Sequence, residues 1–310
     1  MDINELKLMQ NYPLWMKVEK TKRRIMEWYE HWDGQVYVSF SGGKDSTVLV
    51  DIARKLYPDI PVVFVNTGVE YPEVVKHVRS FDNITILRPT KPFHKILQEN
   101  GYPVISKNVS HVVGIVQRNG WECKVAERFK PNNNYGRYDY SKYTYLIDAP
   151  FKISDICCNY LKKLPSHKYE RETGNHPILG TMAEESQTRK KIYLDNGCNA
   201  FNLSRPVSTP LGFWTEQDIF EYIVEYKLSI PSVYGDIIKD AQGNYCTTGL
   251  SRTGCMYCPF GVQYDKYPNR YQRLQHSHPK HYEFMLNKLG FKQVFDYVGI
   301  EYKDRQKKLF

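Results

Sequence analysis

FSGGKDSTV, residues 40–48, directly follows the apolar stretch QVYVSF of residues 35–40. The apolar stretch predicts a β-strand, and the segment STVLVDIARKL at 46–56 predicts a helix whose apolar residues share one face. A turn that contains two glycines and a lysine between a strand and a helix is suited to bind an anion. We therefore expect a triphosphate to bind at this turn.

The turn offers three sources of positive potential. Gly42 and Gly43 allow the backbone to turn tightly, so that N–H groups can face an anion. The helix that begins near Ser46 points its positive N-terminus at the same place. Lys44 adds a full charge. The spacing differs from the GxxxxGK[ST] loop of the common nucleoside triphosphatases, but the same physical logic applies.

Side chains of the turn add hydrogen-bonding groups. Ser41 and Ser46 can donate hydrogen bonds to phosphate oxygens. Asp45 can either orient Mg²⁺ or cap the helix. We expect these groups to lie at the carboxyl end of the first strand, where ligands bind in parallel sheets.

Strands alternate with helices along most of the chain. Apolar runs predict strands at 35–40, 61–67, 84–89 and 176–182, and helical periodicity predicts helices at 15–32, 46–56, 71–81, 93–100, 110–119 and 213–227. This alternation predicts an α/β fold, with a Rossmann-like, mostly parallel sheet and helices on both faces. We expect three segments: a helical segment at 1–33, a nucleotide-binding α/β domain at 34–230, and a cysteine-bearing helical region at 231–310.

Two segments carry clustered cations. The helix at 15–32 has an apolar face and an opposite face with Lys17, Lys20, Lys22, Arg23 and Arg24, which we expect to be solvated. The insertion at 120–148 places tyrosines among arginines and lysines. That insertion predicts either a surface hairpin or a platform on which nucleic-acid bases stack.

Composition limits the class of protein. The 310 residues carry a net charge of +9, which favours an anionic partner such as a nucleotide or a nucleic acid. The sequence has no apolar run long enough for a membrane span. The segment MDINELKLMQ lacks the features of a secretory signal, so we expect a cytoplasmic protein.

Four of the seven cysteines form two close pairs, Cys157–Cys158 and Cys255–Cys258. An odd number of cysteines argues against a disulfide framework. If the fold brings the pairs together, they supply four thiolates, which suit Zn²⁺ or an iron–sulfur cluster. Cys246 is a further thiol that could replace one of the four ligands.

SGGKDS at 41–46 resembles the pyrophosphate-binding PP-loop of the ATP pyrophosphatases, which split ATP into AMP and pyrophosphate. NTGVEYPE (66–73), LGTMAEESQTR (179–189) and RPVSTPLGFWTEQDIFEYI (205–223) resemble motifs of the phosphoadenosine phosphosulfate (PAPS) reductase family. Together the motifs cover roughly residues 33–265, in the family's order. The resemblance implies an adenine nucleotide alpha hydrolase-like fold and an adenine-nucleotide substrate.

The resemblance also implies roles for particular residues. The phosphates would be held by Ser41, Gly42, Gly43, Lys44, Asp45 and Ser46. The nucleotide cleft would also contain Asn66, Thr67, Gly68, Glu184, Glu185 and Arg189. Lys44, Asp45 and Arg189 would serve in catalysis, with Mg²⁺ as the metal. A salt-bridged helix surface is the alternative role for Glu184, Glu185 and Arg189.

The tandem cysteines followed by CxxC resemble the [4Fe–4S] motif of the assimilatory adenylyl-sulfate reductases. That resemblance favours a cluster on Cys157, Cys158, Cys255 and Cys258 over zinc. Reductases of this family carry a nucleophilic cysteine in a C-terminal tail, whereas here no cysteine follows Cys258. The intact loop and the cluster motif resemble instead the branch of the superfamily that inserts sulfur into tRNA bases or the DNA backbone.

We therefore expect an ATP pyrophosphatase that adenylates an acceptor for sulfur transfer, with tRNA or DNA as candidate acceptors. A sulfur donor or a companion protein would be a further partner. One alternative is a sulfonucleotide reductase that binds PAPS or adenosine 5′-phosphosulfate (APS). Another is a non-catalytic subunit that binds a nucleotide or nucleic acid and carries a structural cluster.

Overall fold

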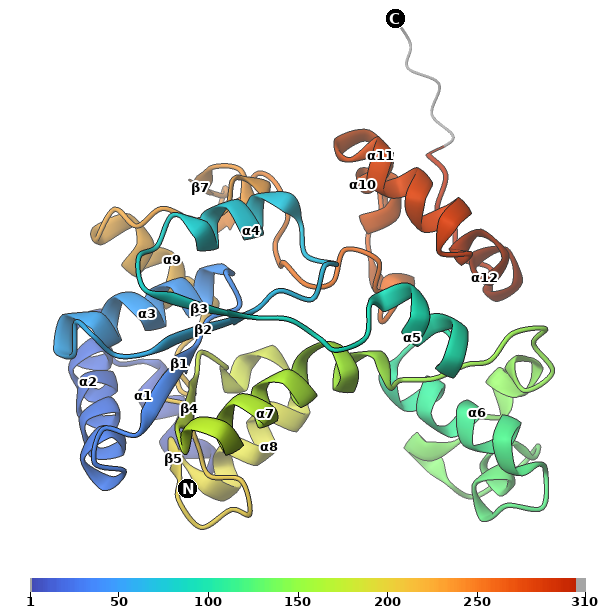
Figure 1. The fold of residues 1–310 in the computed structure, drawn as a ribbon, viewed down its shortest axis with the longest axis horizontal. Helices are drawn as coiled ribbons and strands as arrows, with labels where there is room; N and C mark the ends of the chain where they lie inside the picture. The colour runs from blue at the N-terminus through green and yellow to red at the C-terminus, as the bar shows by residue number, and fades with distance from the viewer. Residues whose placement is uncertain (1, 305–310) are drawn as a thin grey trace, which may run out of the picture. The chain divides into compact units, whose positions relative to one another are not determined.

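A computed structural model describes residues 2–304 of the chain (Figure 1). The chain divides into two compact units. The first comprises Met1–Pro89 and Lys162–Met256, and the second comprises Thr90–Leu161 and Tyr257–Phe310. Segment boundaries at residues 33 and 230 would divide the chain differently, and they remain a sequence-based proposal.

The first unit is built on a six-stranded sheet with the strand order β3-β2-β1-β4-β6-β5. The strands are β1 (Val36–Ser39), β2 (Val62–Val65), β3 (Ile84–Leu87), β4 (His176–Leu179), β5 (Asn199–Ala200) and β6 (Val207–Ser208). All neighbours pair in parallel except β5 and β6. Because β1 lies between β2 and β4, its residue Val38 is in register with both Val62 and Ile178. The predicted Rossmann-like, mostly parallel sheet is confirmed.

Helices lie on both faces of this sheet, and Figure 1 shows α3 and α4 on the opposite side of the strands from α7. The helices of this unit are α1 (Ile3–Gln10), α2 (Leu14–His31), α3 (Lys44–Leu56), α4 (Pro72–Arg79), α7 (Leu164–Thr173), α8 (Gln187–Asn196) and α9 (Glu216–Glu225). Side chains alternate across β1. Val36 and Val38 therefore enter the main core with Trp28, while Tyr37 faces Tyr169 of α7.

Polar contacts inside the core join α2 to α9. The Lys17 ammonium lies 2.6 Å from a carboxylate oxygen of Asp218, and the Lys17 side chain is only 1% exposed. Trp214 donates its indole N–H to Thr21. The prediction that Lys17 belongs to a solvated basic face is wrong, because helix α2 turns this residue toward α9. A buried ammonium needs such a carboxylate partner.

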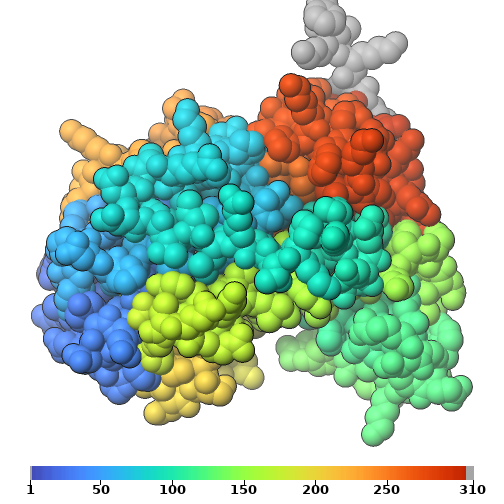
Figure 2. Space-filling model, viewed as in Figure 1, coloured from blue at the N-terminus to red at the C-terminus, as the bar shows by residue number. Residues whose placement is uncertain are grey.

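The edge strand β3 leaves part of its surface exposed. Ile86 is 42% exposed, and on the face drawn in Figure 2 the segment between residues 60 and 90 forms much of the surface of the first unit. A short antiparallel pair, β7 (Ile237–Lys239) and β8 (Tyr245–Thr247), also belongs to this unit. That pair was not predicted from the sequence.

The second unit is helical. Its helices are α5 (Phe93–Asn100), α6 (Lys107–Asn119), α10 (Arg270–Ser277), α11 (Pro279–Glu283) and α12 (Phe291–Val298). Phe93 stacks on both Tyr257 and Phe291, which joins α5 to the C-terminal helices within this unit. The helical character predicted for the C-terminal region is thus present.

Residues 120–148 form three short 3₁₀ helices, at Lys124–Phe129, Gly136–Tyr138 and Ser141–Leu146. The predicted surface hairpin is therefore wrong. Asn133 explains part of the difference, because its side-chain amide donates to the carbonyls of Arg128 and Lys130. These local hydrogen bonds satisfy backbone groups that a hairpin would pair across strands.

None of the helices within residues 2–304 combines the length and apolar character that crossing a membrane requires.

Candidate functional site

The glycine turn after β1 has the backbone geometry that only glycine adopts readily. Gly42 has a φ of +74°, in the left-handed region. A Cβ at this position would lie 2.7 Å from side-chain carbons of both Val74 and Val78 in α4. Gly42 therefore lets the turn approach α4 closely while it redirects the chain into α3.

Gly43 is the N-cap of α3 and supplies no side-chain cap. The serines on either side form a small network around it. The Ser41 and Ser46 hydroxyls lie 3.0 Å apart, the backbone N–H of Ser41 donates to Ser46, and Ser46 Oγ donates to the Gly43 carbonyl. The helix N-terminus thus lies at the carboxyl end of β1 with two hydroxyls beside it.

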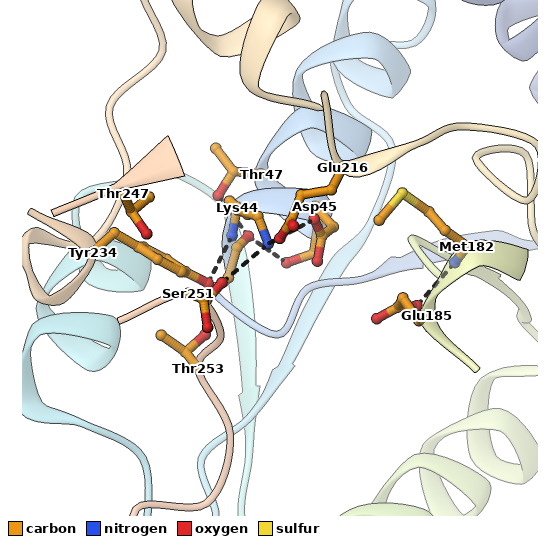
Figure 3. A network of polar contacts seen from close by, with 12 residues as sticks. Lys44, Asp45, Thr47, Met182, Glu185, Glu216, Tyr234, Thr247, Ser251 and Thr253 are labelled. Atoms are coloured by element: carbon orange, nitrogen blue, oxygen red, sulfur yellow. Dashed lines mark hydrogen bonds and ion pairs between the residues drawn. The ribbon is translucent and has the colours of Figure 1, made fainter. Parts of the chain in front are cut away.

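The Lys44 side chain is buried and held by two carboxylates (Figure 3). Its ammonium lies 2.9 Å from Glu216 Oε1 and 3.5 Å from Asp45 Oδ1, and it donates to the Ser251 carbonyl. Burial alone would lower the pKa of Lys44, but Asp45 and Glu216 outweigh it and raise the pKa. Lys44 therefore remains charged. The ammonium points to α9 and to the segment around Ser251.

Asp45 is a candidate ligand for a cation. Burial raises the pKa of its carboxyl group and the charge of Glu216 adds to that effect, although Lys44 opposes it. Apart from the Lys44 ammonium 3.5 Å away, the buried Oδ1 of Asp45 has no hydrogen-bond partner within residues 2–304. Such an oxygen suits Mg²⁺, which prefers carboxylate ligands.

Tyr234 and Thr253 approach the turn from a distant part of the sequence (Figure 3). The backbone N–H of Lys44 donates to the Tyr234 hydroxyl at 3.3 Å, and that hydroxyl lies 2.8 Å from Thr253 Oγ1. A Cβ on Gly43 would lie 3.1 Å from both hydroxyls. The tyrosine thus occupies one backbone donor at the N-terminus of α3.

A cavity of about 120 Å³ opens beside the turn. Ser41 lines it together with Thr253, Gly254, Lys162, which lies two residues before α7, and Ser166 in the first turn of α7. The remaining lining residues come from the ends of β1 and β2, the residues that follow these strands, and the first turn of α4: Ser39, Phe40, Phe64, Val65, Glu70 and Val74. The cavity therefore combines hydroxyls and an ammonium with an apolar floor.

The segment after β2 is ordered by local hydrogen bonds. Thr67 donates from its backbone N–H and its hydroxyl to the Glu70 carboxylate. The N–H of Gly68 donates to the Asn66 side chain, and Gly68 has a φ of +78°. Of these four residues, Glu70 reaches the cavity wall, and it was not selected from the sequence.

The acidic pair after β4 holds the surrounding structure together. Glu184 accepts the backbone N–H of Glu216, and Glu185 accepts that of Met182 while it forms an ion pair with Arg189. Burial and the charge of Arg252 lower the pKa of Arg189, and Asp45 opposes that effect. Arg189 thus feels the charge of Asp45, although its ion pair is with Glu185.

The four paired cysteines divide between the two units. Cys255 belongs to the first unit, one residue before its end, whereas Cys157, Cys158 and Cys258 belong to the second. Within residues 2–304, no group of three or more histidine, cysteine or acidic side chains is placed to hold a metal ion. The assignment of these cysteines, and of Cys246 as a substitute, stays a prediction.

Sequence reasoning missed the residues that come to the turn from far along the chain: His77, Lys162, Glu216, Tyr234, Ser251 and Thr253. Only two of these residues lie near a sequence motif that could have identified them. Glu216 lies inside the WTEQD stretch, and Thr253 lies two residues before Cys255.

A family model described as a phosphoadenosine phosphosulfate reductase domain matches residues 35–98. An uncharacterized protein of Methanocaldococcus jannaschii is 32% identical over 262 residues, which cover 78% of this chain and 47% of that protein. An adenosine 5′-phosphosulfate reductase of Geobacillus thermodenitrificans is 23% identical over 235 residues, which cover 72% of this chain and 81% of the enzyme. The chain thus spans about half the length of the archaeal relative.

Two solved structures are distantly similar. A phosphoadenylyl-sulfate reductase from Candida auris has a TM-score of 0.40 and 15% identity, covering 72% of this chain and 89% of that chain. A U34-tRNA thiolase from Methanococcus maripaludis with a [4Fe–4S] cluster has a TM-score of 0.37 and 15% identity, covering 96% of this chain and 86% of that chain. At these scores neither similarity supports an argument about function.

The stability cost of crowding a side chain at Gly42 can be measured separately from the cost of its positive φ. We expect Gly197→Ala to cost about 1–2 kcal/mol, because Gly197 also has a positive φ but nothing within 4 Å of the added Cβ. Gly42→Ala should cost about 1–3 kcal/mol more, because Val74 and Val78 must move. Urea unfolding of both variants measures the difference. Equal losses of stability would show that the contact with α4 does not constrain the turn.

The ion pair of Lys44 should be measurable by a double-mutant cycle. Lys44→Met leaves the carboxylates of Asp45 and Glu216 without their ammonium, so we expect a clear loss of stability. Glu216→Gln in the Lys44→Met background should cost less than it does alone, with a coupling energy of about 1–3 kcal/mol. Additive losses in urea unfolding would contradict the pairing.

His77 should make stability depend on pH. Burial lowers its pKa to about 4, and its Nε2 lies 3.1 Å from Thr47 Oγ1. The unfolded chain takes up this proton near pH 6.5, before the folded chain does. As the pH is lowered from 7 to 5, protonation of this histidine in the unfolded chain should therefore reduce the free energy of unfolding by about 2 kcal/mol. Urea unfolding of His77→Gln should lack that component, and an unchanged pH dependence would contradict the assignment.

Proposed function

Because residues 35–98 match the phosphoadenosine phosphosulfate reductase domain, we propose that the chain binds ATP at Ser41–Ser46 and splits it into AMP and pyrophosphate while it adenylates an acceptor. The observation that carries the proposal is the turn itself. Its left-handed Gly42 and side-chain-free cap Gly43 put the N-terminus of α3 at the carboxyl end of β1. A helix N-terminus in this position favours phosphate.

The residues around the turn would have different roles in the proposed reaction. An oxygen of the acceptor attacks the α-phosphorus, and the bond from that phosphorus to the bridging oxygen breaks, so that pyrophosphate leaves with the electron pair. Ser41, Ser46 and the N-terminus of α3 would bind the leaving phosphates. Asp45 would hold Mg²⁺, which supplies positive charge as pyrophosphate departs. Catalysis consists of positioning and charge stabilisation.

Lys44 acts in this proposal as a positioning residue. Its ammonium ties the turn to Glu216 and to the Ser251 carbonyl, so it fixes the N-terminus of α3 relative to α9 and the Tyr234–Thr253 hydroxyl pair. Arg189 contributes positive charge near Asp45. Asn66, Thr67 and Gly68 would border the nucleotide at the end of β2, with Glu184 and Glu185 supporting the opposite side.

The acceptor and the sulfur source belong to the same proposal. The net charge of +9 supports a polyanionic acceptor such as tRNA or DNA. Sulfide from a separate donor, or from a companion protein, would then form a bond to the activated atom of the acceptor. The bond from that atom to the AMP oxygen breaks in the same step, and AMP leaves.

A [4Fe–4S] cluster on Cys157, Cys158, Cys255 and Cys258 is the second part of the proposal. The donor set fits, because four thiolates are the usual ligands of such a cluster. Each pair is also held together by the chain: three residues span at most about 11 Å. When bound, the cluster would supply an iron site for sulfur chemistry.

Cysteine substitutions test the cluster without any assay of activity. We expect Cys157→Ser or Cys258→Ser to remove most of the iron and acid-labile sulfide from anaerobically purified protein. Cys198→Ser is the matched control, because Cys198 is buried and lies 3.2 Å from the Tyr193 hydroxyl. Stoichiometric zinc in place of iron would refute the cluster, as would equal iron loss in the control.

The reaction is tested with α-labelled ATP and Mg²⁺, with and without tRNA or DNA, by resolving AMP from ADP. We expect AMP and pyrophosphate, stimulated by one polymer. Ser46→Ala should lower AMP formation at least tenfold, since it removes a hydroxyl beside the leaving phosphates. Lys44→Ala should abolish AMP formation and leave the iron content unchanged.

Two results would redirect the assignment. Absence of AMP under every condition, together with sulfite release from PAPS or APS, would identify a sulfonucleotide reductase. Nucleotide binding without turnover would identify a non-catalytic binding subunit. Normal AMP formation by Lys44→Ala would contradict the role given to the turn.

A further inference from the structure

The second unit contains a cavity of about 370 Å³ that the nucleotide proposal does not use. It is lined by the end of α5, by one side of α6 and by residues 152–156. Ile156 is the last lining residue before Cys157. The volume lies in the range of small-molecule sites, and all lining residues belong to one unit.

The cavity walls are fixed by polar side chains. The Gln117 carboxamide accepts the backbone N–H of Ile153 and donates toward the carbonyls of Leu146, Ile147 and Phe151. The Ser110 hydroxyl joins both backbone groups of Val104. These hydrogen bonds hold α6 and the 146–153 segment in place, so the cavity does not depend on a ligand for its shape.

Gly114 makes room on the α6 side. A Cβ at this position would lie 2.4 Å from the Ile153 carbonyl oxygen and 3.2 Å from Arg118 Nη1. The absence of a side chain therefore lets the 152–156 segment pack closely against α6. It also lets the Arg118 guanidinium fold back across the helix at the cavity wall.

The charges of the lining balance. Arg118 and Lys152 contribute two positive charges, and Glu99 and Asp155 contribute two negative charges, of which Glu99 also forms an ion pair with Lys91 outside the lining. Asp155 is partly oriented by His111, whose Nδ1 lies 3.1 Å from its Oδ1. A lining with both signs and no net charge disfavours a simple anion. Such a lining offers cations to the carboxylate of a small molecule and a carboxylate to its ammonium group.

We propose that this cavity binds a free α-amino acid, with its carboxylate at Arg118 and Lys152 and its ammonium at Asp155. The zwitterion satisfies both signs of the lining at once, which neither a phosphate nor an amine does. The proposal is independent of ATP cleavage, because it rests only on the second unit.

The test measures binding by the full chain in the absence of ATP. Thermal unfolding is recorded with each standard amino acid at millimolar concentration. At least one should raise Tm by roughly 2 °C or more when saturating. Calorimetric titration with that amino acid should then give a Kd that Arg118→Gln and Asp155→Asn each weaken at least tenfold. Arg273→Gln, an exposed arginine of α10, is the control and should leave the Kd unchanged.

Derivatives of the same amino acid separate a zwitterion site from other sites. Its amide lacks the carboxylate and its N-acetyl form lacks the ammonium, so both should bind at least tenfold more weakly. Equal binding of either derivative would overturn the proposal, as would an equal Tm shift with inorganic phosphate. A failure of every amino acid to shift Tm would overturn it as well. None of these results bears on AMP formation.

Discussion

A buried ammonium group holds the phosphate-binding turn in place. Lys44 lies at the first position of α3, and its side chain reaches Glu216 of α9 and the Ser251 carbonyl. Three segments that are far apart in the sequence therefore meet at one charge. Because a buried ammonium without carboxylate partners would be costly, the position of the turn and the position of α9 depend on each other.

The same contact changes the role that we assign to Lys44 within the glycine turn. A lysine in a glycine turn is easily interpreted as a direct phosphate ligand. Here its ammonium points to Glu216, while the backbone N–H of Lys44 lies at the helix N-terminus and donates to Tyr234. Phosphate binding would then rely on backbone N–H groups and hydroxyls, and a ligand at this point would compete with the tyrosine hydroxyl. The left-handed Gly42 and the missing side chain at Gly43 make that approach possible.

Much of the fold followed from local patterns. The apolar runs predicted β1 to β4, and periodicity predicted α2 to α6 and α9, because each of these elements buries one regular face. Lys17 was misplaced, since its burial depends on Asp218 about two hundred residues away. The hairpin expected at 120–148 failed because Asn133 and its neighbours satisfy backbone groups locally. The sequence located the glycine turn, but Tyr234 and Thr253 reach it only through the folded chain.

The most direct measurement is a crystal structure with an ATP analogue that cannot be cleaved between the α- and β-phosphates. The account predicts the β- and γ-phosphates at the N-terminus of α3, beside Ser41 and Ser46. The Tyr234 hydroxyl should have moved away from the Lys44 N–H, with the ammonium still on Glu216. Phosphates bound elsewhere, with Tyr234 still hydrogen-bonded to Lys44, would contradict the assignment of this turn.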